Sequence, residues 1–290
     1  MMNFNRTALC FLAFFAVAVA QPARAEDVAS VAKSAQIRIS YEPPQNANYR
    51  PIYEALKRRQ VLERLQSFLS PLRLPKELSV RLAQCGSDTM RYQAGGPATI
   101  CYELVKRIAD IAAQHTKDPN EQAQMMEGTF VEAVLHQVAY GVFDLLQVPI
   151  WGREDDAADR LTALIMMQFG EQVALTTIVG TARFFEYSNH TWTGEDFAAE
   201  SSPEGQRFYN YLCIAWGADP VTFQFVAPRP GPSMFPRLPE HRAYGWCRRE
   251  YAQVRDAFNL RIMPFVDPDL LVKVRASRWL LSDEIPANLK

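Results

Sequence analysis

Apolar and polar residues alternate in three short segments of the first third of the chain. These segments are residues 37–41, 78–82 and 99–102, and proline or glycine residues lie close to each of them. Strict alternation is typical of half-buried strands, because successive side chains of a strand point to opposite faces of the sheet. The sequence therefore predicts a small sheet in the N-terminal part of the chain.

Elsewhere the apolar residues recur with the spacing of a helix. One helix is expected at 51–69, after which Pro71 and Pro75 end the pattern. Beyond the third strand, helical periods dominate in residues 103–115, 120–147, 156–187, 203–216 and 240–258. Residues 226–239 contain five prolines and are expected to form a loop. The predicted fold class is α+β, mostly helical, with residues 26–290 as a single domain.

The composition is that of an ordinary globular protein. Hydrophobic residues make up 48% of the chain and charged residues 22%, and the formal net charge is −1. This balance excludes disorder, collagen and coiled coil as descriptions of the whole chain. Nucleic-acid binders usually carry a basic excess or a clustered basic face. The sequence has neither, so we expect no nucleic-acid partner.

Residues 1–25 have the features of a secretory leader, or signal peptide. Arg6 supplies a positive charge, an apolar run of fourteen residues follows at 7–20, and Ala23-Arg24-Ala25 fits the small-residue pattern of a cleavage site. The apolar run is too short to span a bilayer, and no later stretch reaches the length of a spanning helix. We therefore expect an exported protein, periplasmic or secreted, that is cleaved near Ala25 and has no membrane span.

Four cysteines remain after the predicted cleavage: Cys85, Cys101, Cys213 and Cys247. An even number in an oxidising compartment favours two disulfides, for which three pairings are possible. Pairing within each sequence neighbourhood closes the shortest loops, so we expect Cys85–Cys101 and Cys213–Cys247. The spacings do not match those of zinc-binding cysteine pairs.

The segment 131–146 is apolar almost all the way round a helix, which is typical of a helix buried on every side. We therefore expect His136 to lie deep in the protein, with Tyr140 one turn later. From these residues alone two interpretations stay open, a histidine hydrogen-bonded into the core or a metal ligand. After Pro149 and Gly152 comes an acidic cluster, whose simplest interpretation is a helix N-terminus; its members are Glu154, Asp155, Asp156 and Asp159.

The segment from Val131 to Asp159 resembles the signature of a family of proposed secreted metallopeptidases, a domain of unknown function. Members of that family typically read H-E-V-G-H-A-x-F-D-L-L-x-x-P-x-x-G-R-E-E-D-A-A-D. The resemblance extends from the Y-E-P-P sequence at Tyr41 through Cys101 to Gln206 and covers most of the chain. It implies a zincin-like fold, in which a short sheet lies against an active-site helix and a second helix supplies a third ligand.

In such a motif, two histidines four residues apart lie on one helical face and bind one zinc ion, while the glutamate beside the first histidine activates a water molecule. Carried onto this chain, His136 matches the first histidine. Asp155 matches the ligand glutamate, with its neighbour Glu154 as an alternative. Asp159 matches an acid that would orient a ligating histidine from behind. Zinc is the cofactor that the resemblance implies if the site is live.

Three positions of the motif differ in this chain. Gln137 replaces the general-base glutamate and has no carboxylate to accept a proton from water, a loss that typically costs about 10²–10⁴ in rate. Tyr140 replaces the second histidine, and a phenol with an ordinary pKa of about 10 is mostly protonated at neutral pH. Asp155 is one methylene shorter than glutamate, which retracts its carboxylate by roughly 1.5 Å.

Two hypotheses of different class follow from these departures. The first is a pseudoenzyme, a zincin-like scaffold with a degenerate H-E-x-x-H site that no longer cleaves peptides and binds or positions a protein or peptide partner. The second is a live metal-dependent hydrolase with an atypical site around His136, Glu154, Asp155 and Tyr140. A third is a purely structural protein whose cleft is closed by Tyr140. We favour the first, and with it no cofactor is expected.

Overall fold

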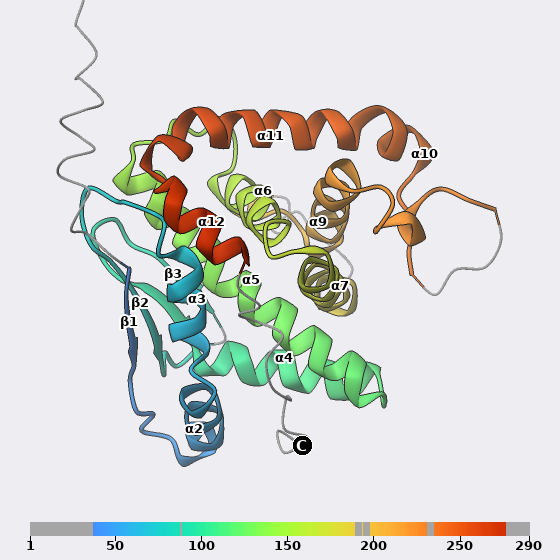
Figure 1. Cartoon of the computed structure of the whole chain (residues 1–290). Coiled ribbons are helices and arrows are strands. Elements are labelled where there is room, and N and C mark those ends of the chain that lie inside the picture. The colour runs from blue at the N-terminus through green and yellow to red at the C-terminus, as the bar shows by residue number, and fades with distance from the viewer. Residues whose placement is uncertain (1–36, 88, 189–192, 194–197, 231–234, 277–290) are drawn as a thin grey trace, which may run out of the picture.

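The computed structural model describes residues 37–87, 89–188, 193, 198–230 and 235–276 (Figure 1). The predicted leader and its cleavage site near Ala25 lie outside the described residues. Within the described ranges, no helix is long and apolar enough to cross a membrane.

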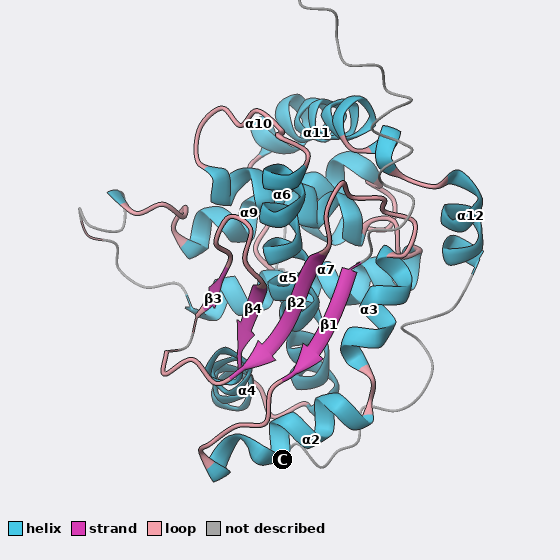
Figure 2. Ribbon diagram, turned by 90° about the vertical axis from the view of Figure 1, so that its left-hand side faces the viewer, coloured by secondary structure: helices cyan, strands magenta, loops and turns pink. Residues whose placement is uncertain are grey.

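A sheet of four strands forms one side of the protein (Figure 2). Its strands are β1 (Ile37–Tyr41), β2 (Leu78–Ala83), β3 (Met90–Arg91) and β4 (Ala98–Cys101), in the order β1-β2-β4-β3. The first three in that order are parallel, with Ile39 opposite Val80 and Leu82 opposite Ile100, and β3 is an antiparallel edge strand. The three predicted strands are therefore confirmed. The two-residue strand β3 is too short to leave an alternation pattern in the sequence, so it could not be predicted.

The remaining elements are mostly helices, so the predicted α+β, mostly helical class is confirmed. They are α2 (Arg50–Arg58), α3 (Val61–Leu69), α4 (Tyr102–His115), α5 (Pro119–Leu145), α6 (Glu154–Met166), α7 (Glu171–Ser188), α9 (Glu204–Ala218), α10 (Glu240–Arg242), α11 (Arg248–Arg261) and α12 (Pro268–Ala276). A π-helical turn, Ala243–Cys247, joins α10 to α11. Short 3-10 turns lie at Ala47–Tyr49, Gln224–Val226 and Met263–Phe265.

Two predicted helices are each divided in the structure, so those two predictions were wrong. The helix expected at 51–69 breaks at Gln60, whose φ of 52° places it in the left-handed region. The helix expected at 156–187 breaks at Gly170, whose φ is 90°. Both residues turn the chain between two helices. Gly170 gave a sequence signal for such a turn, whereas a glutamine rarely adopts this conformation.

The long helix α5 lies at the centre of the protein and packs against the sheet and several other helices (Figures 1 and 2). Two glycines allow α5 and α7 to approach closely. A Cβ atom on Gly128 would overlap the carbonyl oxygen of Thr177, and one on Gly180 would overlap that of Gln124. On the sheet side, Gly141 lies directly against Leu78 of β2. The burial of α5 on most of its circumference matches the apolar pattern of its sequence.

Both predicted disulfides are confirmed. Cys85 pairs with Cys101, with 5.5 Å between their Cα atoms, and this bond ties the loop after β2 to the end of β4. Cys213 pairs with Cys247, with 4.8 Å between their Cα atoms, and this bond ties α9 to the residue before α11.

Candidate metal centre

His136 lies in the middle of α5 and is completely buried. Its Nε2 atom is 3.0 Å from Oδ1 of Asp155, and its Nδ1 atom is 2.9 Å from Oδ1 of Asp159. The two aspartates are four residues apart on α6, so they lie on one face of that helix and reach the imidazole from two sides.

The loop between α5 and α6 sets the position of these aspartates. The sequence passes Pro149 and then Gly152, which has a φ of 102°. That conformation favours glycine and turns the chain so that α6 begins at Glu154. The guanidinium of Arg153 donates to the carbonyl oxygen of Ser201, which ties this corner to the segment before α9.

Tyr140 occupies the position one turn after His136, where the family motif has its second histidine. Its hydroxyl group donates to Oδ1 of Asp155 at 2.8 Å, and its ring centre is 5.3 Å from that of His136. Oδ1 of Asp155 is therefore bonded to both side chains. Among the described residues, Oδ2 of Asp155 and Oε1 of Gln137 are buried and have no hydrogen-bond partner.

A second layer of charged residues lies behind His136 and was missed by the sequence analysis. The guanidinium of Arg207, on α9, donates to Asp159 at 2.6 and 2.8 Å and to Glu132 at 3.0 Å. The hydroxyl of Tyr211 donates to Glu132 at 3.1 Å. Glu132 lies one turn before His136 on α5, and a carboxylate in so apolar a helix was a usable sequence signal. Nothing in the sequence alone placed Arg207 beside it.

These contacts determine the charge states of the buried groups. Burial alone would lower the pKa of His136, but the hydrogen bonds to Asp155 and Asp159 raise it to about 9. Burial likewise opposes ionisation of Asp159, yet the charge and hydrogen bonds of Arg207 hold the pKa of that carboxyl well below its usual range. At neutral pH, His136 is therefore an imidazolium that donates one N–H to each aspartate.

The pKa values of Tyr140 and Glu132 shift in the direction that favours their neutral forms. Burial raises the pKa of the Tyr140 phenol, and the charge of the nearby Asp155 raises it further. Burial also raises the pKa of Glu132, although Arg207 opposes this. Tyr140 therefore stays protonated at neutral pH and acts as a hydrogen-bond donor.

The structure brings together most of the residues that the sequence analysis selected. His136, Tyr140 and Asp155 meet at one point, Asp159 lies behind the imidazole, and Gln137 is buried on the neighbouring face of α5. Glu154 is exposed at the first residue of α6, and no described contact joins it to His136. Asp155, and not Glu154, therefore lies beside His136.

The donor set at this point does not fit the two-histidine, one-carboxylate set of a catalytic zinc site. The donors at this point are one imidazole, from His136, one carboxylate, from Asp155, and one phenol, from Tyr140. Both nitrogens of the imidazole face carboxylates, and the phenol stays protonated. A ligating histidine must be neutral and must turn a nitrogen lone pair to the metal. The unpartnered Oδ2 of Asp155 is the only acceptor among these three side chains that no neighbour satisfies.

The fold and the site define the class of protein: an α+β protein with a buried histidine–carboxylate centre between two helices. The chain belongs to a family described as "Putative metallopeptidase", which matches residues 41–260. The match runs from the end of β1 into α11 and so includes the whole centre. No curated protein and no solved structure matches the chain significantly.

Proposed function

We propose that this protein is an exported, zincin-like member of its metallopeptidase family that does not hydrolyse peptides and instead has a binding or structural role towards a protein or peptide partner. The observation that carries the proposal is the way His136 is held. Both of its ring nitrogens lie within 3.0 Å of carboxylate oxygens on α6, and the hydroxyl of Tyr140 donates to the same Oδ1 atom of Asp155 that faces Nε2.

The hydrogen bonds around Asp155 take the place of metal ligation. A zinc ion between His136 and Asp155 would need the Nε2 proton to leave and the two groups to move apart, since two ligands at bonds of about 2.1 Å in a tetrahedral site are roughly 3.4 Å from each other. The pKa of His136, raised to about 9, opposes the loss of that proton. Tyr140 adds no compensating ligand, because its phenol is a donor to the same oxygen.

Gln137 stands where the family motif has its general base, so the chain lacks that base as well. Its amide has the shape of a glutamate side chain but cannot accept a proton from a water molecule at neutral pH. Even a chain that captured a metal ion would therefore lack the positioned base that peptide hydrolysis uses in this kind of site.

Export remains part of the proposal and has independent support. Two disulfides are typical of proteins that fold in an oxidising compartment, and the first 25 residues have the pattern of a signal peptide. The partner proposed for an inactive homologue is a protein or peptide, because the description of the family names a peptidase.

An active hydrolase with an atypical site is the second candidate, and one observation favours it. Oδ2 of Asp155 and Oε1 of Gln137 are both buried acceptors without a partner among the described residues. A buried acceptor is normally satisfied, and a bound cation or a water molecule would satisfy these two. In this reading His136 and Asp155 hold a metal ion other than the zinc of a two-histidine site.

The experiment that separates the candidates is a stepwise repair of the motif. Tyr140→His should raise zinc affinity, and more so with Asp155→Glu, because a second imidazole and a longer carboxylate are restored. Only the further change Gln137→Glu should give turnover of a quenched fluorescent peptide library. Gln253→Glu, at an exposed glutamine of α11, is the matched control and should have no effect.

Two results would overturn the proposal. One is chelator-sensitive peptide cleavage by the wild-type protein that His136→Ala abolishes. The other is a repaired triple variant that folds and binds zinc, while the wild-type protein already binds zinc equally well. Circular dichroism of every variant shows whether a negative result reflects loss of the fold.

A further inference from the structure

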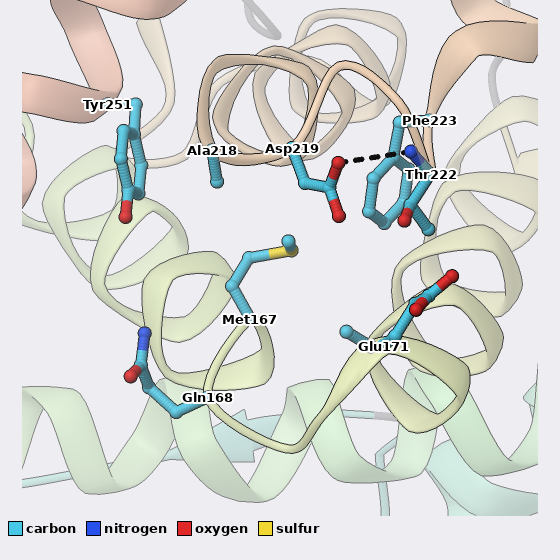
Figure 3. Close-up of a pocket in the computed structure, with 9 residues that line it drawn as sticks. Met167, Gln168, Glu171, Ala218, Asp219, Thr222, Phe223 and Tyr251 are labelled. Carbon is cyan, nitrogen blue, oxygen red and sulfur yellow. Dashed lines mark hydrogen bonds between the residues drawn. The ribbon is translucent and has the colours of Figure 1, made fainter.

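An apolar groove with a volume of about 80 Å³ lies between α3, α5, α6, α11 and α12. Gln168 is the only polar residue among the fifteen described residues that line it. Figure 3 shows another pocket that Gln168 borders, whose lining includes the carboxylates of Asp219 and Glu171. The two pockets therefore differ in chemistry. The groove suits an apolar occupant, because the burial of apolar groups is favourable.

One wall of the groove comes from α5 and α6, the helices that carry the histidine centre. Its residues are Val138, Ala139 and Val142 of α5 and Leu161 and Ile165 of α6. The end of α3 forms another wall, and the end of α11 and Leu271 of α12 complete the lining (Figure 1). An apolar occupant would therefore contact several elements at once and strengthen the packing of α6 against α5.

Backbone hydrogen bonds hold the chain between α11 and α12, residues 262–267, against the loop after α3. The N–H of Arg73 donates to the carbonyl oxygen of Phe265 at 2.7 Å, and the N–H of Asp267 donates to that of Pro71 at 2.8 Å. Oδ1 of Asp267 then accepts two N–H groups in the first turn of α12. These bonds fix the place where α12 begins, with Leu271 in the groove.

The chain continues beyond α12 with an apolar sequence. Residues 277–290 lie outside the described residues, and they include Trp279-Leu280-Leu281. Five residues lead from Leu271 to Ala276 at the end of α12, which is about 7.5 Å of helix. The next five residues reach up to about 17 Å when extended. The three apolar side chains are therefore within reach of the groove.

The chemistry and the volume of the groove favour these residues as its occupant. Large apolar side chains are most often buried in folded proteins. The volume of about 80 Å³ is about half that of an engineered cavity of roughly 150 Å³ that binds benzene, so the groove suits a leucine side chain better than a whole indole ring. A tryptophan at the opening of the groove would keep its indole N–H in contact with water.

We propose that the Trp279-Leu280-Leu281 sequence docks in the apolar groove of its own chain, with a leucine side chain inside the groove and the indole ring over its opening. The family match ends at residue 260, so α12 and this sequence lie beyond it, whereas the wall from α5 and α6 lies within it. The docked residues hold together the two helices that bring Asp155 to His136. This inference is independent of whether the histidine centre is active.

Hydrogen exchange followed by mass spectrometry tests the docking in the chain that remains after the predicted cleavage. The backbone amides of residues 279–281 should exchange about tenfold or more slowly than in a synthetic peptide of residues 277–290, because docking orders them. Leu280→Asp combined with Leu281→Asp should remove this protection, since an unpaired carboxylate is costly to bury. Leu289→Asp, the same change further along the chain, is the matched control and should keep the protection.

A second pair of variants tests the location. Leu271→Lys places a charge in the groove and should also release residues 279–281. Val272→Lys is the matched control at the next position, which is 68% exposed, and should keep the protection. Release should open the groove, so the fluorescence of the apolar dye ANS should rise in Leu271→Lys and in the double aspartate variant. Circular dichroism shows whether each variant keeps the fold.

Four outcomes would overturn the inference. The first is exchange of residues 279–281 in the wild-type protein as fast as in the free peptide. The second is protection that survives both the double aspartate change and Leu271→Lys. The third is protection that appears only with a dimer in gel filtration, since the groove would then hold the segment of a second copy. The fourth is one equivalent of an apolar compound extracted from the purified protein, which would make that compound the occupant.

Discussion

Replacing Arg207 by methionine tests the buried charge network most severely. The Arg207 side chain is only 12% exposed, and its partners Asp159 and Glu132 are 0% and 3% exposed. Methionine keeps much of the volume but removes the guanidinium from both buried carboxylates, which leaves the His136 imidazolium as the cation beside Asp159. Removing one partner of a buried ion pair typically costs about 3–5 kcal/mol. For a protein of this size that loss corresponds to a fall in Tm of roughly 6–20 °C.

Urea denaturation followed by circular dichroism measures this cost. Arg38→Met is the matched control, because its side chain is 71% exposed and its ion pair with Glu77 lies at the surface, where such pairs are worth at most about 1 kcal/mol. Combining Arg207→Met with Asp159→Asn and Glu132→Gln should recover much of the loss, since no buried charge is then left unpaired. A change below about 1 kcal/mol for Arg207→Met, or a triple variant less stable than the single one, would refute the reasoning.

Three further predictions concern the scaffold. The pKa of His136 is raised from 6.5 to about 9, so the contribution of this protonation to stability is complete below pH 6.5 and is lost as the pH rises to about 9. The loss is on the order of 3 kcal/mol. Urea denaturation between pH 6 and pH 9.5 measures the loss of stability, and NMR titration of the imidazole measures the pKa. Gly180→Ala should destabilise the protein by about 1–3 kcal/mol, because the new methyl group overlaps the carbonyl oxygen of Gln124. Thermal unfolding measures this, and an unchanged Tm would show that α5 and α7 pack less closely. Replacing Cys213 and Cys247 together by alanine opens a loop of 34 residues and should cost about 4 kcal/mol in the chain-entropy model, and equal stability of variant and wild type would contradict the assigned pairing.

Sequence patterns predicted the parts of the fold that depend on local order. Alternation predicted β1, β2 and β4, and apolar periodicity predicted α4, α5 and α9 to within two residues at each end. The break at Gln60 could not be predicted in this way, because a left-handed glutamine is held by the packing of α2 and α3 and leaves no local signature.

The residues of the candidate site could also be predicted only in part from the sequence. His136, Tyr140, Asp155 and Asp159 could be selected because their spacing follows helical geometry and a family motif. Their mutual hydrogen bonds depend on how α6 packs against α5. The role of Arg207 depends on a third helix, α9, and only the tertiary structure brings its guanidinium between two buried carboxylates.

The most direct test of the central claim is the zinc content of the wild-type protein. Protein without a His tag is equilibrated with two equivalents of zinc, passed through a gel-filtration column and analysed for metal by mass spectrometry. The variant that combines Gln137→Glu, Tyr140→His and Asp155→Glu is treated in the same way. We predict far less than one zinc per wild-type chain and about one per repaired chain. About one zinc per wild-type chain, lost in His136→Ala, would contradict the account.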